Sequence, residues 1–244
     1  YSSAASDVYK RQDEYNVSIT DDEKAAITAA AAQFMEDNSK DAINALGATQ
    51  EIVEEYLTLE TIQSKMKAAI VAGADTNVTD EEAKTGAYSY VGISKTTHQD
   101  ESGNTVDYTD EEKEELAAKV ADFAKAAKED GLDAAAEDAG YTVSTGTFTQ
   151  EDDSVDDNLL AALKNLKEGE VTDLIDGDSS YFVARLDKEV DEDATEETRQ
   201  SIIEQRKDDL YDETLDGWKE GIEWAVKEKV WDDVNFDNLF TTIK

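Results

Sequence analysis

The sequence predicts an α+β protein in which a helical domain, built from both ends of the chain, carries an inserted module of antiparallel sheet and helices. Three observations predict this class. Apolar residues recur every three or four positions over long segments near both ends. Stretches rich in β-branched and aromatic residues lie in the middle of the chain. The last amphipathic segment, residues 195–229, would be a helix of about 50 Å, so its apolar stripe needs a partner surface on the leading helices.

We divide the 244 residues into four parts. Residues 1–12 lack the acidic excess and the apolar period of the rest, and we expect them to be a non-native leader. The other predicted parts are an N-terminal helical segment (13–86), a central module (87–190), and a C-terminal long helix and tail (191–244) that complete the helical domain.

Helix starts are marked three times by a threonine followed three positions later by a glutamate. In this capping box each side chain accepts a hydrogen bond from the backbone N–H of the other residue. The pairs are Thr20/Glu23, Thr79/Glu82 and Thr109/Glu112. With glycines marking helix ends, the N-terminal segment is expected to hold helices over 20–38, 39–46, 49–72 and 79–85.

The central module is expected to run in the order strand, helix, helix, strand, helix, strand, strand. A polar loop, 95–108, follows the first strand, and the turn Asp-Gly-Asp-Ser joins the last two strands into a hairpin. The predicted limits of the elements are 87–94, 109–129, 132–139, 141–148, a leucine-rich helix over 159–166, 171–175 and 181–186.

Composition excludes several classes of function. A formal net charge of −37 excludes a nucleic-acid binder that works by neutralising phosphates and argues against binding to anionic membrane surfaces. The absence of cysteine excludes disulfides and thiolate sites. No apolar run approaches about 18 residues, and no signal peptide is recognisable.

No metal or cofactor is expected. The sequence contains no Gly-rich phosphate loop, zinc signature or Ser-His-Asp order. Its acidic runs, 151–153 and 191–193, lack the spacing of a calcium loop and are expected to be solvated. His98, the only histidine, lies in the polar loop without a partner for metal binding or proton transfer, so we expect it to be solvated as well.

The stretch 163–190, LKNLKEGEVTDLIDGDSSYFVARLDKEV, carries the most specific pattern. Its helix end, Gly-Glu-Val and hairpin resemble the C-terminal half of the parvulin-type (PpiC-type) peptidyl-prolyl isomerase domain, and AYSYVGIS resembles that domain's opening strand. The motifs LGATQEIVEEY and VTDEEAK in the helical segment resemble the leading part of PrsA/SurA-type foldases. The resemblance implies a helical chaperone domain with a parvulin-like module inserted in it.

The resemblance also points to individual residues. Tyr90 and Phe182 occupy the positions of the family's two histidines, which implies that the catalytic network is degenerate. Val155 and Leu159 fall where the family has apolar pocket residues that bind substrate. The alternative for Val155 and Leu159 is an ordinary role in the core of an amphipathic helix.

Trp218 and Trp224 are further candidates for substrate binding. A tryptophan facing an open groove could bind apolar side chains of unfolded proteins. Packing against the N-terminal helices is the alternative, because large aromatic residues dominate cores.

The resemblance implies an extracytoplasmic protein-folding factor, attached to the cell envelope or secreted, with weak or no isomerase activity. Its partners would be unfolded or partly folded client proteins, and it would meet a membrane only through a lipid anchor outside this sequence. Two alternatives stay open. One is an active isomerase with a rearranged pocket, in which Tyr90 donates a hydrogen bond. The other is a non-catalytic surface interaction module.

Overall fold

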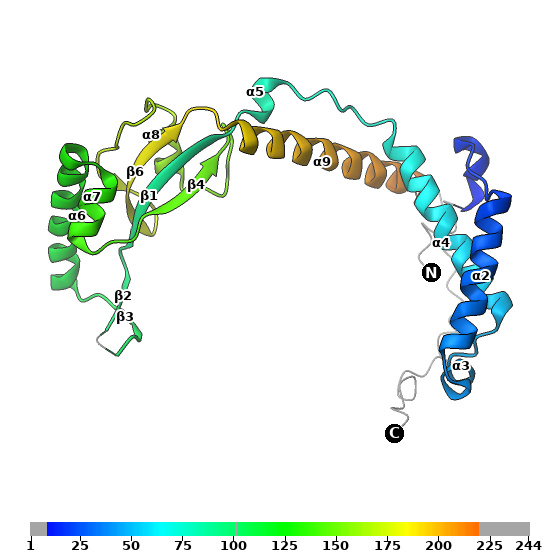
Figure 1. Ribbon diagram of the computed structural model, residues 1–244. Coiled ribbons are helices and arrows are strands. Elements are labelled where there is room, and N and C mark those ends of the chain that lie inside the picture. Colours follow the sequence, from blue (N-terminus) through cyan, green and yellow to red (C-terminus); the bar gives the residue numbers. More distant parts are fainter. Residues whose placement is uncertain (1–8, 101, 220–244) are drawn as a thin grey trace. The chain divides into compact units, whose positions relative to one another are not determined.

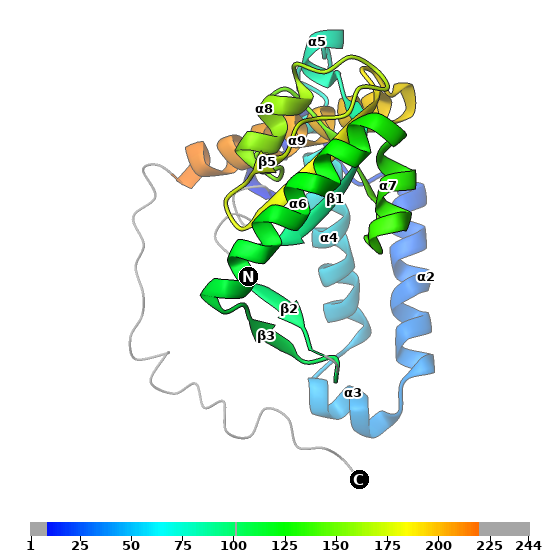
Figure 2. The same cartoon turned by 90° about the vertical axis from the view of Figure 1, so that its left-hand side faces the viewer.

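The computed structural model describes residues 9–100 and 102–219, which fall into two compact units (Figures 1 and 2). The described part of the first unit, 9–74 and 206–219, joins both ends of the chain and is helical. The second unit, Asp75–Gln205, holds the sheet. The predicted fold class, α+β with a sheet module inserted in a helical domain, is thereby confirmed. The predicted central module, 87–190, lies within the second unit.

The first unit is built around two long helices, α2 (Asp21–Asp37) and α4 (Gln50–Val71), which lie side by side (Figures 1 and 2). Its N-terminal elements are η1 (Gln12–Tyr15), α2 (Asp21–Asp37), α3 (Lys40–Leu46) and α4 (Gln50–Val71).

The C-terminal part of α9 (Glu192–Lys219) belongs to the same unit. Leu215 and Trp218 of this helix pack against a core of Val17, Ile62 and Met66. The apolar stripe of the last helix therefore packs on the leading segment, as the sequence predicts. The predicted continuation of the helix to residue 229 and the tail after it lie outside the described residues.

All three predicted capping boxes are present. In each, the threonine hydroxyl accepts the backbone N–H of the glutamate at 3.2 Å. The glutamate carboxylate in turn accepts the threonine N–H at 2.7–2.8 Å. Satisfying these N–H groups fixes the starts of α2, α5 (Asp80–Ala83) and α6 (Asp110–Asp130).

The capping glutamate of α2 also joins this helix to α4. The Lys65 ammonium lies 2.7 and 2.8 Å from the two carboxylate oxygens of Glu23. Hydrogen bonds from Lys65 and from the Thr20 N–H lower the pKa of Glu23 from 4.5 to about 2. Because the folded-state pKa is depressed, this stabilisation is complete above pH 4.5 and is lost as the pH falls through about 2.

We expect the first unit of Glu23→Gln to lose less stability than that of the wild type when the pH is lowered from 4.5 to 2. Glutamine keeps the cap but removes the charge. Urea denaturation at a series of pH values, followed by tryptophan fluorescence, measures this dependence. Glu36→Gln, at an exposed position of the same helix, is the matched control. An identical pH dependence in Glu23→Gln and the wild type would contradict the prediction.

The second unit contains a four-stranded antiparallel sheet in the order β4-β1-β6-β5. Its elements follow the predicted order, with one added hairpin, β2–β3. Besides α5, α6 and the start of α9, they are β1 (Gly86–Ser94), β2 (Thr97–Gln99), β3 (Thr105–Asp107), α7 (Leu132–Ala139), β4 (Ser144–Phe148), α8 (Asp157–Leu163), β5 (Ile175–Asp176) and β6 (Ser180–Lys188).

Helices cover both faces of this sheet (Figure 1). Because successive side chains of a strand point to opposite faces, β6 contributes to two cores. Val183 packs with β1 and with α6 and α7 on one face. Ala184 and Leu186 pack with α8 on the other face. Polar residues are few inside, and the buried Thr172 uses its hydroxyl to accept the Ala184 N–H at 3.0 Å.

The hairpin β2–β3 lies in the segment that the sequence predicts to be a polar loop. Asp100 closes its turn by accepting the N–H groups of Ser102 and Asn104, both at 2.8 Å. These hydrogen bonds lower the pKa of Asp100, those from Asn104 most strongly. A carboxylate that accepts backbone N–H groups in this way stabilises a turn, and three-residue strands can then pair beside it.

Two predicted strands are shorter than expected. The strand predicted over 141–148 begins at Ser144, and Tyr141, which precedes it, packs edge-to-face with Phe123 with ring centroids 5.0 Å apart. The strand predicted over 171–175 is reduced to a bridge at Val171 and to β5. Between them, the Ala184 N–H of β6 donates to the Thr172 hydroxyl instead of to a backbone carbonyl.

The start of α9 is tied to the entry of β1. The Asp191 N–H donates to the Thr85 carbonyl at 2.8 Å, and the Thr85 N–H donates to the Thr195 hydroxyl at 3.2 Å. Arg199 adds an ion pair with Asp80 at 2.8 Å. The chain therefore leaves the second unit beside the point at which it enters.

Candidate functional site

Tyr90 and Phe182 meet on the face of the sheet that α8 covers. In the register of β1 and β6, Phe182 lies opposite Gly92, two residues from Tyr90, so both rings project from the same face. Their centroids are 6.2 Å apart. Gly92 leaves room for them, because a Cβ there would lie 3.2 Å from Phe182 and 3.5 Å from Tyr90.

The other wall of this site comes from α8 and the residue just before its cap. Leu159 is 2% exposed within the core on this face, and Val155, Tyr90 and Phe182 are partly buried against that core. The structure thus brings together four residues that the sequence singled out. We call Tyr90, Val155, Leu159 and Phe182 the aromatic site.

Tyr88 extends the aromatic surface beneath the site. Its ring centroid lies 5.4 Å from that of Tyr90 and 5.9 Å from that of Phe148. Burial, together with Tyr90 and Asp152, raises the pKa of Tyr88, so its hydroxyl stays protonated. Sequence reasoning missed Tyr88, although the alternation Tyr-x-Tyr-x-Gly from Tyr88 to Gly92 places all three residues on one face.

Asp156 fixes α8 against the β5–β6 turn. One carboxylate oxygen accepts the N–H groups of Asn158 and Leu159 at 3.0 and 3.2 Å, and the other accepts the Asp178 N–H at 2.8 Å. Partial burial alone would raise the pKa of Asp156, but these hydrogen bonds together lower it. Lys95 supports the same turn through an ion pair with Asp176. The Asp156 carboxylate therefore ties α8 to the turn before Phe182, and the Asn158 side chain adds a second link by donating to the Asp176 carbonyl at 2.9 Å.

We expect Asp156→Ala to lower the free energy of unfolding of the second unit by about 2 kcal/mol, near the upper end for loss of a helix N-cap. The effect should be large for a cap because the bond to the Asp178 N–H is lost as well. Amide hydrogen exchange over α8 and the β5–β6 turn measures it. Asp157→Ala, at the exposed first residue of the helix, is the control and should change little. Equal effects of the two variants would contradict the capping role.

The aromatic site is apolar apart from tyrosine hydroxyls. Phe182 has no polar side-chain atom, and the only histidine of the sequence, His98, lies in β2. A pair of histidines therefore cannot form here. What the site offers a ligand is contact with the exposed parts of the Tyr90, Val155 and Phe182 side chains, which are partly buried. Rotation about an amide bond has a barrier of about 18–20 kcal/mol without further help.

Trp218 lies apart from the rest of the candidate set. Trp218 is partly buried in the first unit, where its ring meets Tyr15 edge-on at 5.9 Å and lies 5.2 Å below the Arg11 guanidinium. It is therefore not part of the core that holds the aromatic site. Trp224 lies outside the described residues.

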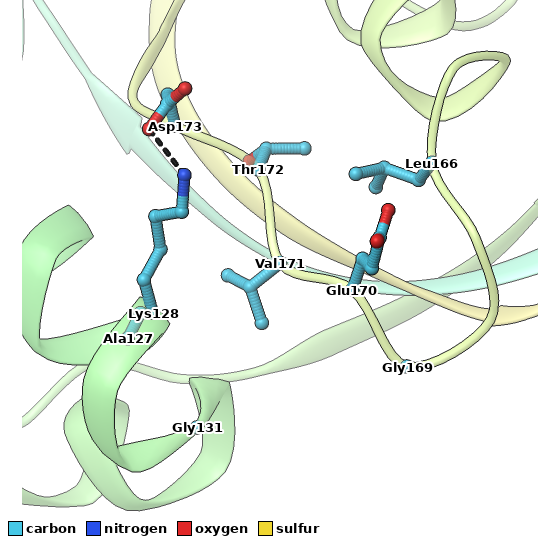
Figure 3. A pocket seen from close by; sticks show the side chains of 9 residues that line it. All are labelled: Ala127, Lys128, Gly131, Leu166, Gly169, Glu170, Val171, Thr172 and Asp173. Carbon is cyan, nitrogen blue, oxygen red and sulfur yellow. Dashed lines mark hydrogen bonds and ion pairs between the residues drawn. The ribbon is translucent and has the colours of Figure 1, made fainter.

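A cavity of about 520 Å³ lies beside the sheet, between the end of α6 and the segment that leads into β5 (Figure 3). The Lys128 side chain reaches across from α6 to Asp173 at 2.6 Å, and the Val171 side chain projects toward α6 from the segment that leads into β5 (Figure 3). None of the predicted site residues lines it. Within the described part of the chain, no group of three histidine or acidic side chains is placed to hold a metal ion.

The comparisons with known proteins identify the central part of the chain. The family model described as the PPIC-type PPIASE domain matches residues 95–220, just over half of the sequence. The match includes Phe182, Val155 and Leu159, whereas Tyr90 lies before its start. No curated protein matches the chain.

Solved structures of low sequence identity are also similar to this chain. A PrsA peptidylprolyl isomerase from Bacillus cereus is 19% identical, with 92% of this chain and 84% of that chain covered and a TM-score of 0.39. PrsA from Bacillus anthracis is 20% identical, with 91% and 97% covered and a TM-score of 0.34. A SurA-like chaperone structure from Campylobacter jejuni is 11% identical, with 89% and 82% covered and a TM-score of 0.34.

Proposed function

Because the chain belongs to the family of proteins with a PPIC-type peptidyl-prolyl isomerase domain, we propose that it is a protein-folding factor that holds unfolded clients and has weak or no isomerase activity. The single observation that supports this proposal most is the aromatic site. It has a partly buried apolar surface that could contact a proline-containing segment. The sequence resemblance further implies that Tyr90 and Phe182 occupy the positions of the family's histidines.

The physical argument separates binding from catalysis. Binding an apolar segment requires apolar surface removed from water, worth about 25 cal/mol per Å². Accelerating rotation about an X-Pro bond also requires groups that interact more strongly with the twisted amide than with the planar one. Val155 and Phe182, which are only partly buried, supply the first requirement, whereas Leu159 is already buried in the core beneath them. Nothing in their chemistry supplies the second, and Tyr90 is the one member of the site with a hydrogen-bond donor.

High negative charge suits such a role. With a net charge of −37, copies of the chain repel one another, and a complex with an aggregation-prone client would stay soluble.

Suppression of client aggregation tests the proposal. Light scattering of a thermally unfolding client, at equimolar amounts of the full chain, should fall well below that of the client alone. An unrelated protein of similar net charge is the control for a pure charge effect, and Phe182→Ala should weaken the protection. Scattering equal to that with the control protein would overturn the proposal.

An active isomerase with a rearranged pocket is the second candidate, and one observation favours it. Within the part of the chain that the structure describes, the Tyr90 hydroxyl forms no hydrogen bond, so it is available to a bound peptide. Tyr90→Phe removes that hydroxyl and keeps the ring. Loss of activity in this variant, measured with a proline peptide, would support the second candidate over the first.

We also propose an extracytoplasmic location, with the protein either attached to the cell envelope or secreted. The cysteine-free, acidic composition is compatible with it. Within the described residues, the helices are all too short or too polar to cross a membrane. Fractionation of the source cells tests the proposal, and recovery of the protein with cytoplasmic markers would contradict it.

A further inference from the structure

A second groove lies on the sheet face opposite the aromatic site. The β2–β3 hairpin and α6 enclose a cavity of about 340 Å³. We call this cavity the hairpin groove, and its apolar and aromatic lining residues are Ile93, His98, Tyr108, Leu116 and Tyr141. Such a volume is at the low end for ligand pockets and suits a few side chains rather than a folded domain.

Aromatic contacts hold the walls of the hairpin groove in place. His98 stacks on Tyr108, with ring centroids 4.5 Å apart and planes 21° from parallel. On the other side, Tyr141 is fixed by its edge-on contact with Phe123. Leu116, 7% exposed, lies beneath them. His98 is therefore not the solvated loop residue that the sequence predicts, because its side chain is only 30% exposed and belongs to a wall.

The hairpin groove has an acidic edge. Glu112 Oε1 lies 3.9 Å from His98 Nε2, and the Thr109 N–H and hydroxyl hydrogen bonds lower the pKa of Glu112. Glu115, one turn further along α6, lines the same cavity and is exposed. Lys119 is the one cationic residue among the lining residues. Two carboxylates against one ammonium, in a chain of net charge −37, favour a cationic ligand.

Strand geometry separates the two sites. Ile93 and Tyr90 are three residues apart on β1 and therefore project from opposite faces. Ile93 packs with the core under α6 and α7, whereas Tyr90 packs with the core under α8. A segment bound in the hairpin groove would thus leave the aromatic site open.

We propose that the hairpin groove is a second client-binding site, which takes an extended segment carrying an aromatic or aliphatic side chain next to lysine or arginine. The large side chain lies between the His98–Tyr108 stack and Tyr141, and the cationic neighbour faces Glu112 and Glu115. This inference rests on the proposed function, because it names the chemistry of the clients. It adds a site on the face away from the one that the family resemblance singles out.

Binding of a short labelled peptide tests the inference. The probe is a proline-free octapeptide that alternates phenylalanine or leucine with lysine, followed by fluorescence anisotropy with the full chain. We expect it to bind, and we expect the same peptide with glutamate in place of lysine not to bind. Glu115→Lys should weaken binding about tenfold or more, because an attraction becomes a repulsion. Glu114→Lys, on the same helix but not lining the groove, makes the same change of charge and should have a much smaller effect.

A second measurement locates the peptide. Backbone amide shifts on titration should be largest at Ile93, Tyr108 and Tyr141 and small at Tyr90 and Phe182. Equal losses in Glu115→Lys and Glu114→Lys, or equal binding of the acidic peptide, would overturn the proposed site. If the chain suppresses client aggregation but binds neither peptide, the second site is wrong and the proposed function stands. If the basic peptide binds in the groove but clients still aggregate, the site stands and the folding function fails.

Discussion

Replacing Leu163 by alanine should lower the free energy of unfolding of the second unit by about 2–5 kcal/mol. Leu163 is 1% exposed and lies in the core on the α8 face of the sheet, among Phe148, Leu160 and Leu186. The truncation removes apolar contacts and leaves a cavity that a small sheet and a seven-residue helix can fill only in part.

Amide hydrogen exchange over β1 and β6 is the suitable measurement for Leu163→Ala. All three tryptophans lie after residue 217, so tryptophan fluorescence does not report on this unit. Val190→Ala, at a valine of the same unit that is 46% exposed, is the control and should change stability by less than about 0.5 kcal/mol. Comparable protection in Leu163→Ala and the wild type would contradict the assignment of this core.

Replacing Gly177 by alanine should destabilise the second unit by about 1–3 kcal/mol and move the Phe182 ring. A Cβ at this position would lie 2.5 Å from Asp156 Oδ2 and 2.6 Å from Phe182 Cε2. Both neighbours must then shift, and they are the carboxylate that fixes α8 and the ring that forms the aromatic site. The substitution therefore couples stability to the geometry of the site.

Gly217→Ala, in the part of α9 that belongs to the first unit, shows the effect of the same substitution on its own unit where nothing lies within 4 Å of a Cβ. That variant should be neutral or stabilising by up to about 1 kcal/mol, because alanine favours helix. Chemical shifts of the Phe182 ring, with hydrogen exchange, measure both effects of Gly177→Ala. A folded variant with unchanged stability and unchanged Phe182 shifts would contradict the close packing of this turn.

The parts of the fold that depend on local chemistry could be predicted from the sequence. Each Thr/Glu pair forms a capping box because its hydrogen bonds join residues only three apart. The packing of α9 on the leading segment followed from the length of the predicted helix, because its apolar stripe is longer than the surface that the central module can offer. The presence of β1 and β6 followed from the resemblance of their sequences to two strands of one domain, whereas their pairing is seen only in the structure.

Details that depend on tertiary context could not be predicted. Thr172 interrupts a predicted strand by using its hydroxyl in place of a carbonyl, and β-propensity does not encode that choice. Tyr141 lies outside its predicted strand and packs edge-to-face with Phe123 of α6, a contact between separate elements. The hairpin β2–β3 is a different case, because its turn depends on Asp100 and could have been recognised from the local Asp-x-Ser-Gly-Asn pattern.

The candidate site was predictable in its members but not in its arrangement. Tyr90, Phe182, Val155 and Leu159 were named from a resemblance, and the structure brings them onto one face. Their roles in binding or catalysis stay predictions. The role of Asp156 in holding α8 to the turn requires a contact across 22 residues, which no local pattern reveals.

The central claim is that this site can hold a client segment but barely accelerates rotation about its X-Pro bond. The rate of a proline-limited refolding reaction, measured with catalytic amounts of the full chain and an intact parvulin-type isomerase as reference, tests it most directly. We predict a rate close to that of the uncatalysed reaction. Acceleration comparable to the reference, abolished by Phe182→Ala, would contradict the claim.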